Sequence, residues 1–191
     1  MSVLRLVAGL HRGRRLAAPP GETTRPTSDR VRQAVFDMLL HAPWADNGTG
    51  EGAVEGQRVL DAFAGSGALG LEALSRGAAH ACFLESDRVA LAVLRQNVVA
   101  LKEEARCTVL GGDVLRPRAA PAPCGLVLLD PPYGRDLVPK ALAALSAAGW
   151  IAPGALVVAE TGREEALEAP GFTEVAAREH GAVRVAFLRA A

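Results

Sequence analysis

Two stretches of this sequence carry residue types and spacings that suit chemistry. The first runs from Val59 to Gly70 and reads Val-Leu-Asp-Ala-Phe-Ala-Gly-Ser-Gly-Ala-Leu-Gly. A short apolar run there leads into glycines at 65, 67 and 70, and a helical pattern follows. Strand, glycine turn and helix in this order are typical of a site for a nucleotide-like ligand, because glycine lets the main chain touch the ligand.

An acidic residue supports a nucleoside on this turn. Glu85 ends the next apolar run, about twenty residues beyond Gly65, where a carboxylate can accept hydrogen bonds from both ribose hydroxyls. Three interpretations stay open. A nicotinamide or flavin dinucleotide would set its pyrophosphate on the helix N-terminus, S-adenosylmethionine would set its methionine part against the turn, and a turn without ligand is the third. Asp61 favours S-adenosylmethionine, because an acid inside the strand can face the positive amino end of the methionine.

The second stretch is Asp130-Pro-Pro-Tyr133, which follows a fully apolar strand. Pro131 and Pro132 cannot donate backbone hydrogen bonds and hold the chain extended. The carboxylate of Asp130 and the carbonyl of Pro131 are then fixed acceptors beside the ring of Tyr133. This set suits a planar ring with an exocyclic NH2, whose lone pair is freed for attack on a sulfonium methyl by positioning and electrostatics. A surface turn is the alternative, because Asp-Pro-Pro is a good turn former.

The remaining polar residues indicate less. Asp113 ends a predicted strand, where it can accept a hydrogen bond from a cofactor's adenine amine or cap a turn. Cys82, Cys107 and Cys124 are scattered, which predicts buried thiols in a reducing cytoplasm rather than disulfides. The sequence contains no grouping of residues that suggests a metal site.

Length and composition predict one cytoplasmic domain. The chain has 191 residues, half of them hydrophobic, which is enough for a substantial core. Its apolar runs are shorter than the roughly 18 residues of a membrane span, and its first residues lack the apolar core of a signal peptide.

Positive charge is concentrated near the start of the chain. The whole sequence has 21 basic and 21 acidic residues, but residues 1–42 hold seven arginines against three acids. We expect a β-hairpin from Val3 to Ala18 with a basic tip, then a helix capped by Thr27 or Ser28. An anion such as RNA phosphate suits the arginines and the helix N-terminus, although a solvated basic surface would look the same. The residues predicted to contact RNA are Arg12, Arg14, Arg15, Arg25, Thr27, Arg30 and Arg32.

Alternating strands and helices predict a parallel sheet with helices on both faces. The sequence divides into an N-terminal extension at 1–42, a polar linker at 43–57 and a catalytic domain at 58–191. The terminal pair of strands has only a short turn between its members and must be antiparallel. The expected strands are 58–63, 79–85, 108–110, 126–129, 155–160, 173–178 and 182–188, and the expected helices of the domain are 67–77, 87–102 and 136–148.

These motifs together resemble the RsmD family of bacterial ribosomal RNA methyltransferases, which make N2-methylguanosine in 16S ribosomal RNA. The glycine turn and Asp130-Pro-Pro-Tyr133 are shared by many amino-methyltransferases, whereas Thr24-Arg-Pro-Thr-Ser-Asp-Arg-Val-Arg32 is much more specific. The resemblance also covers Arg5-Leu-Val-Ala-Gly9, Arg12-Gly-Arg-Arg-Leu16 and Leu60 to Ala78.

The resemblance implies an α/β class I methyltransferase (Rossmann-like) fold, with a seven-stranded, mostly parallel sheet whose last strand is antiparallel, plus the N-terminal hairpin and helix. It implies S-adenosylmethionine as cofactor and 16S ribosomal RNA, within an assembling small subunit, as partner of a monomer without metal or membrane. Asp130 to Tyr133 would form the catalytic loop. The implied cofactor residues are Asp61, Phe63, Ala64, Gly65, Ser66, Gly67, Glu85 and Asp113.

Other functions remain as alternatives. Asp-Pro-Pro-Tyr chemistry also serves DNA adenine and glutamine side chains, so an amino-methyltransferase for either is the nearest rival. A dinucleotide oxidoreductase would need a catalytic pair that the sequence does not offer. A non-catalytic RNA-binding protein on the same scaffold is the third alternative, and the intact Asp130 to Tyr133 argues against it.

Overall fold

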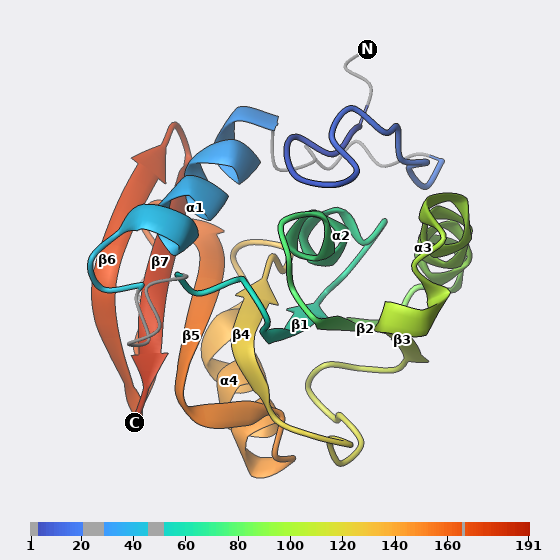
Figure 1. Ribbon diagram of the computed structural model, residues 1–191. Coiled ribbons are helices and arrows are strands. Elements are labelled where there is room, and N and C mark those ends of the chain that lie inside the picture. Colours follow the sequence, from blue (N-terminus) through green and yellow to red (C-terminus); the bar gives the residue numbers. More distant parts are fainter. Residues whose placement is uncertain (1–3, 21–28, 46–51, 166) are drawn as a thin grey trace.

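The computed structural model describes residues 4–20, 29–45, 52–165 and 167–191. They form a seven-stranded sheet with helices on both faces (Figure 1). The strands are β1 (Arg58–Ala62), β2 (His80–Glu85), β3 (Cys107–Gly111), β4 (Cys124–Leu129), β5 (Ile151–Gly162), β6 (Phe172–His180) and β7 (Val183–Ala190). The helices are α1 (Asp29–His41), α2 (Ala68–Ser75), α3 (Arg88–Leu101), the 3-10 turn η1 (Glu104–Arg106) and α4 (Leu137–Ala147).

The strand order is β3-β2-β1-β4-β5-β7-β6. The pairs among β1 to β5 are parallel, and β7 runs antiparallel to both β5 and β6. The predicted mostly parallel sheet with its last strand antiparallel is therefore confirmed. The order reverses between β1 and β4, and ligands of open α/β sheets bind at such a switch point.

Successive side chains of each strand point to opposite faces of the sheet, and this divides the core into two layers. Val59 and Phe83 pack with α1, α2 and α3 on one face, whereas Leu60 and Val127 pack with α4 on the other. Side chains of a strand point to opposite faces in turn, so a strand buried on both faces must be apolar throughout. Asp61 interrupts this rule at a fully buried position.

The N-terminal segment packs on the same core as the sheet. Leu6, Phe36 and Val54 are buried in one cluster with Leu71 of α2. The expected hairpin is short: one antiparallel bridge joins Arg5 to Arg15, and Leu6 N and Leu16 N donate across it to Arg14 O and Leu4 O. Closer to the tip, the N–H groups of Val7 and Ala8 donate to Glu72 of α2 rather than across the hairpin. The boundaries at 42 and 57 stay predictions.

Strand β5 is longer than the sequence predicts. It begins at Ile151 rather than 155, and the parallel register with β4 shifts between Cys124 and Leu126. Pro153 and Gly154 lie in this irregular part, which explains why the apolar pattern starts only afterwards. Predicted strand 126–129 likewise begins earlier, at Cys124.

Candidate active site

Acidic and aromatic side chains follow one another across the carboxyl edge of the parallel strands. Ala62 of β1 lies opposite Leu84 of β2 and Leu129 of β4, and Leu129 lies opposite Ala159 of β5. The next residues along these strands therefore form a row across the sheet, in the order Glu85, Phe63, Asp130 and Glu160. The glycine turn and the Asp-Pro-Pro-Tyr loop leave this row side by side, as predicted from a parallel sheet.

The glycine turn has the backbone that the sequence indicates. Gly65 and Gly67 have φ of 52° and 82°, the left-handed region that side chains disfavour. A Cβ at Gly67 would collide with Cδ1 of Leu94 from α3. Glycine at 67 thus suits both the left-handed backbone and the close packing of α3 against the turn. Phe63, with φ of 66°, shares this unusual conformation without being glycine.

Asp61 holds the start of the helix after the turn. Its Oδ2 accepts a hydrogen bond of 2.8 Å from the backbone N–H of Gly70, inside the first turn of α2. Burial raises the pKa of Asp61 well above its ordinary value, while that hydrogen bond lowers it and the carboxylates of Asp130 and Glu85 add to the rise. That Asp61 also faces a methionine ammonium stays a prediction.

Glu85 organises the backbone around it with both carboxylate oxygens. Oε2 accepts from the N–H of Gly65 and Oε1 from the N–H of Asp87, each at 2.7 Å. A carboxylate oxygen has two acceptor sites, so ribose hydroxyls still have acceptors there. Asp87 in turn caps α3, where its Oδ1 accepts from Ala90 N at 2.8 Å.

A pocket of about 360 Å³ opens beside this acid. It is lined by Pro19, Pro20, Gly65, Glu85, Asp87, Val89 and Ala90. Among the described residues, the lining joins two carboxylates to an apolar wall without a cationic side chain, which suits a ribose and the apolar face of a base and disfavours a pyrophosphate. Asp113 is exposed and its Oδ1 accepts from Leu115 N at 2.9 Å, the turn role that the sequence left open. Ala64 and Ser66 are buried in the turn.

The predicted catalytic loop presents its aromatic ring to solvent. Tyr133 is 46% exposed, and its hydroxyl donates a 3.2 Å hydrogen bond to Oε2 of Glu160. Burial, and then the negative charges of Glu160 and Asp130, raise the pKa of Tyr133, so the hydroxyl stays protonated at neutral pH. Pro131 is buried, while Pro132 is exposed.

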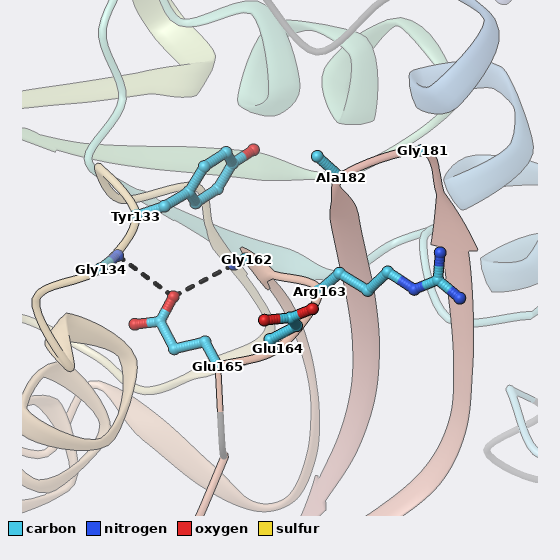
Figure 2. A pocket seen from close by; sticks show the side chains of 8 residues that line it. All are labelled: Tyr133, Gly134, Gly162, Arg163, Glu164, Glu165, Gly181 and Ala182. Carbon is cyan, nitrogen blue, oxygen red and sulfur yellow. Dashed lines mark hydrogen bonds between the residues drawn. The ribbon is translucent and has the colours of Figure 1, made fainter.

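A second pocket, of about 710 Å³, lies against Tyr133 (Figure 2). Figure 2 shows Glu165 reaching across to the loop, where its Oε2 accepts from Gly134 N at 3.3 Å and Gly162 N at 3.1 Å. Oε1 accepts from Asp136 N at 3.3 Å. The lining residues are Tyr133, Gly134, Gly162, Arg163, Glu164, Glu165, Gly181 and Ala182.

Glu160 and Glu165 are site residues that were not predicted from the sequence. Glu160 had a detectable signal, because it ends the apolar run of its strand, as Glu85 does. Glu165 had none, since its partners become neighbours only when the loop after β4 folds back onto the end of β5.

The predicted RNA-contacting arginines do not all face solvent. Arg12, Arg14, Arg15 and Arg30 are exposed, and Arg14 also donates from Nη2 to the carbonyl of Ala100 at 2.6 Å. Arg32 is 1% exposed.

The prediction for Arg32 is corrected on that ground. Its Nη2 donates to the carbonyl of Arg5 and to Oδ1 of Asp29, and its Nε lies 3.6 Å from Oε2 of buried Glu72. A guanidinium enclosed in this way stabilises the junction of α1, α2 and the N-terminal segment, and phosphate has no access to it. Arg25 and Thr27 lie outside the described residues.

The described residues, 4–20, 29–45, 52–165 and 167–191, offer neither a candidate metal site nor a membrane-spanning helix. Those ranges hold no cluster of three or more His, Cys, Asp or Glu side chains placed to share a metal ion. None of the helices described there is both long and apolar enough to cross a membrane.

Comparison with known proteins gives close relatives over nearly the whole chain. A protein named Ribosomal RNA small subunit methyltransferase D, from Escherichia coli (strain K12), is 37% identical over 164 residues, which cover 86% of this chain and 77% of the relative. The protein of that name from Haemophilus influenzae is 36% identical over 171 residues, 87% of this chain and 83% of the relative.

Solved structures agree. The structure described as putative methyltransferase yhhF from Escherichia coli has a TM-score of 0.82 at 34% identity, over 99% of this chain and 98% of that one. An RNA methyltransferase from Salinibacter ruber in complex with S-adenosyl-L-homocysteine has a TM-score of 0.63 at 16% identity, which shows the shared Rossmann-like fold. Residues 4–189 match the family model described as Conserved hypothetical protein 95, and the chain therefore belongs to that family, as its resemblance to the RsmD methyltransferases predicts.

Proposed function

We propose that this protein transfers a methyl group from S-adenosylmethionine to the exocyclic N2 amine of a guanine in 16S ribosomal RNA. The row across the carboxyl edge of the sheet carries the proposal, because it sets a nucleoside-type pocket at Glu85 beside acceptors and an aromatic ring at Asp130 to Tyr133. The names of the relatives supply the ribosomal substrate.

The residues of the pocket fit this cofactor. Glu85 would accept hydrogen bonds from the ribose hydroxyls, with Val89 and Pro19 against the apolar side of the nucleoside. The turn at Gly65 to Gly67 would carry the methionine part, and Asp61 its ammonium. The bound cofactor supplies an electrophilic methyl on a sulfonium sulfur.

The loop supplies the rest of the chemistry. The guanine would stack on Tyr133, while Asp130 and the carbonyl of Pro131 accept hydrogen bonds from its amine and hold the lone pair toward the methyl. No covalent intermediate is required, and positioning with electrostatics accounts for the rate. The second pocket, on the far side of Tyr133, is the entrance for the flipped-out base.

The exposed arginines of the N-terminal segment would hold the RNA backbone. Arg12, Arg14, Arg15 and Arg30 offer bidentate contacts to phosphates, and Arg25 and Thr27 remain in the proposal. We place the protein in the cytoplasm as a monomer. We take an assembling small ribosomal subunit as its substrate, because proteins in that particle can contribute RNA-holding surface that an enzyme with no net charge lacks.

The experiment compares acceptors for labelled methyl. Purified protein with labelled S-adenosylmethionine is offered free 16S RNA, small subunits from a strain lacking this protein, DNA and ribosomal protein in parallel. We expect label in N2-methylguanosine of the RNA, with subunits the better substrate. Label in adenine of DNA or in glutamine would transfer the proposal to that amine, and binding of NAD instead of S-adenosylhomocysteine would end it.

A further inference from the structure

One buried amide joins the N-terminal segment to the glycine turn. Asn97 of α3 is 3% exposed. Its Oδ1 accepts from the backbone N–H of Ala17 at 2.8 Å, and its Nδ2 donates to the carbonyl of Ala17 at 3.0 Å and to the carbonyl of Ser66 at 2.9 Å. All three side-chain bonds therefore serve main-chain groups of two segments that are distant in sequence.

Both segments adjoin the same pocket. Ser66 follows Gly65, which lines the pocket, and Ala17 comes two residues before Pro19, which lines the pocket together with Pro20 and Glu85. Pro19 is itself buried. Figure 1 shows the N-terminal segment, in dark blue, passing over α2 to reach α3.

A separate set of bonds holds the other part of the N-terminal segment. The N–H groups of Val7 and Ala8 donate to the carboxylate of Glu72, and Ser75 bonds to both the carbonyl of Ala8 and the N–H of His11. Loss of the Asn97 amide would thus release residues 17–20 while the earlier residues stay on α2.

We infer that Asn97 is a positioning residue for the cofactor site. Through Ala17 it holds the wall that Pro19 and Pro20 form, and through Ser66 it holds the turn beside Gly65. The inference rests on the proposed S-adenosylmethionine site and goes beyond it, because it makes the N-terminal segment part of that site. A ligand enclosed by this wall binds more tightly when the wall is held, and by linkage the bound ligand holds the wall.

Calorimetry with S-adenosylhomocysteine tests the inference on the full chain. Asn97→Ala should weaken binding by roughly 5- to 150-fold, the range of coupling between linked sites. Gln96→Ala is the matched control, since it removes an amide from the exposed side of the same helix and should bind as the unaltered protein does. Equal affinity of a folded Asn97→Ala protein would overturn the inference.

Hydrogen exchange supplies a readout that a merely structural residue would not move. In the unaltered protein, S-adenosylhomocysteine should slow exchange at the N–H of Ala17, and in Asn97→Ala this ligand-dependent protection should vanish. If Asn97→Ala does not fold, a Pro19→Gly, Pro20→Gly double variant decides instead. Weaker binding by that variant supports the wall, and unchanged binding overturns it.

A failure of the proposed function can be told apart from a failure of this inference by the unaltered protein alone. An unaltered protein that binds no S-adenosylhomocysteine at all would contradict the cofactor assignment itself, before any variant is compared.

Discussion

At the scale of single residues, the site is a set of carboxylates with different tasks. Glu85 and Asp61 both accept backbone N–H groups near the glycine turn, whereas Glu160 accepts the hydroxyl of Tyr133. Asp130 lies between Glu85 and Glu160 in the row across the sheet edge. Glu85, Asp61 and Glu160 therefore each bind protein atoms in addition to any acceptor that they offer to a ligand.

Asp130 is proposed as an acceptor rather than a nucleophile. Asp130→Ala should lower kcat by roughly 10²–10³, the usual effect of losing one positioned electrostatic contact. Asp130→Asn keeps an acceptor oxygen and should retain more activity. Single-turnover methyl transfer measures both variants, and an Asn variant slower than Ala would contradict the acceptor role.

Tyr133 should act mainly through its ring. Tyr133→Ala should lower kcat/KM by roughly 5- to 150-fold, because base–aromatic stacking is worth about 1–3 kcal/mol. Tyr133→Phe should cost only a few-fold, and that cost should come from the lost bond to Glu160. Steady-state kinetics separate the two, and a Phe variant as inactive as Ala would assign chemistry to the hydroxyl.

The ionised carboxylate of Asp61 should destabilise the folded protein, because it is buried under α2. Its folded pKa is raised, so the folded state binds the proton more tightly than the unfolded state. The free energy of unfolding should then fall as the pH rises above the unfolded value, about 3.9. Asp61→Asn keeps an acceptor for Gly70 N and should remove this fall.

Urea unfolding of both proteins between about pH 4 and pH 7 measures the difference. The advantage of Asp61→Asn should grow with pH, while its affinity for S-adenosylmethionine should drop. An advantage that shrinks as the pH rises would contradict the direction of the pKa shift.

At the scale of elements, α1 presents two arginines of opposite character. Arg30 is exposed, whereas Arg32 is enclosed near Glu72, Asp29 and the carbonyl of Arg5. Removal of Arg32 would break a buried ion pair with Glu72 and weaken the compensation of that buried carboxylate. Arg76 also pairs with Glu72 and would still compensate part of its charge. The helix therefore binds the sheet domain through one arginine and offers the other to solvent.

Arg32→Ala should lower the free energy of unfolding by on the order of 3 kcal/mol. Arg30→Ala should leave it within about 0.5 kcal/mol. Denaturant melts compare the two directly, and equal stabilities would mean that Arg32 is not held as the structure has it.

At the scale of the whole molecule, the two pockets flank the glycine turn and the catalytic loop at one edge of the sheet. The chain has no net charge, yet its first 42 residues carry seven of the 21 basic residues and only three of the 21 acidic ones. Contact with a polyanion should therefore be local, through the exposed arginines of this segment.

A combined Arg12→Ala, Arg15→Ala, Arg30→Ala variant should bind RNA more weakly. The slope of log affinity against log salt should flatten by about one unit for each lost phosphate contact. Arg118→Ala is the control, since it removes an exposed arginine from the loop that enters β4 at the opposite end of the strand. Unchanged RNA binding by the triple variant would make the segment structural only.

The sequence alone predicted the succession of strands and helices along the chain, the glycine turn, and the sheet edge that Glu85 and Asp130 share. These features follow from local periodicity and from the rule that parallel strands end at one edge. Only the tertiary structure decided that Arg32 is enclosed, that Gly67 makes room for Leu94, and that Asn97 joins Ala17 to Ser66. Each of these depends on side chains of segments far apart in the chain, and no local pattern encodes which of them will meet.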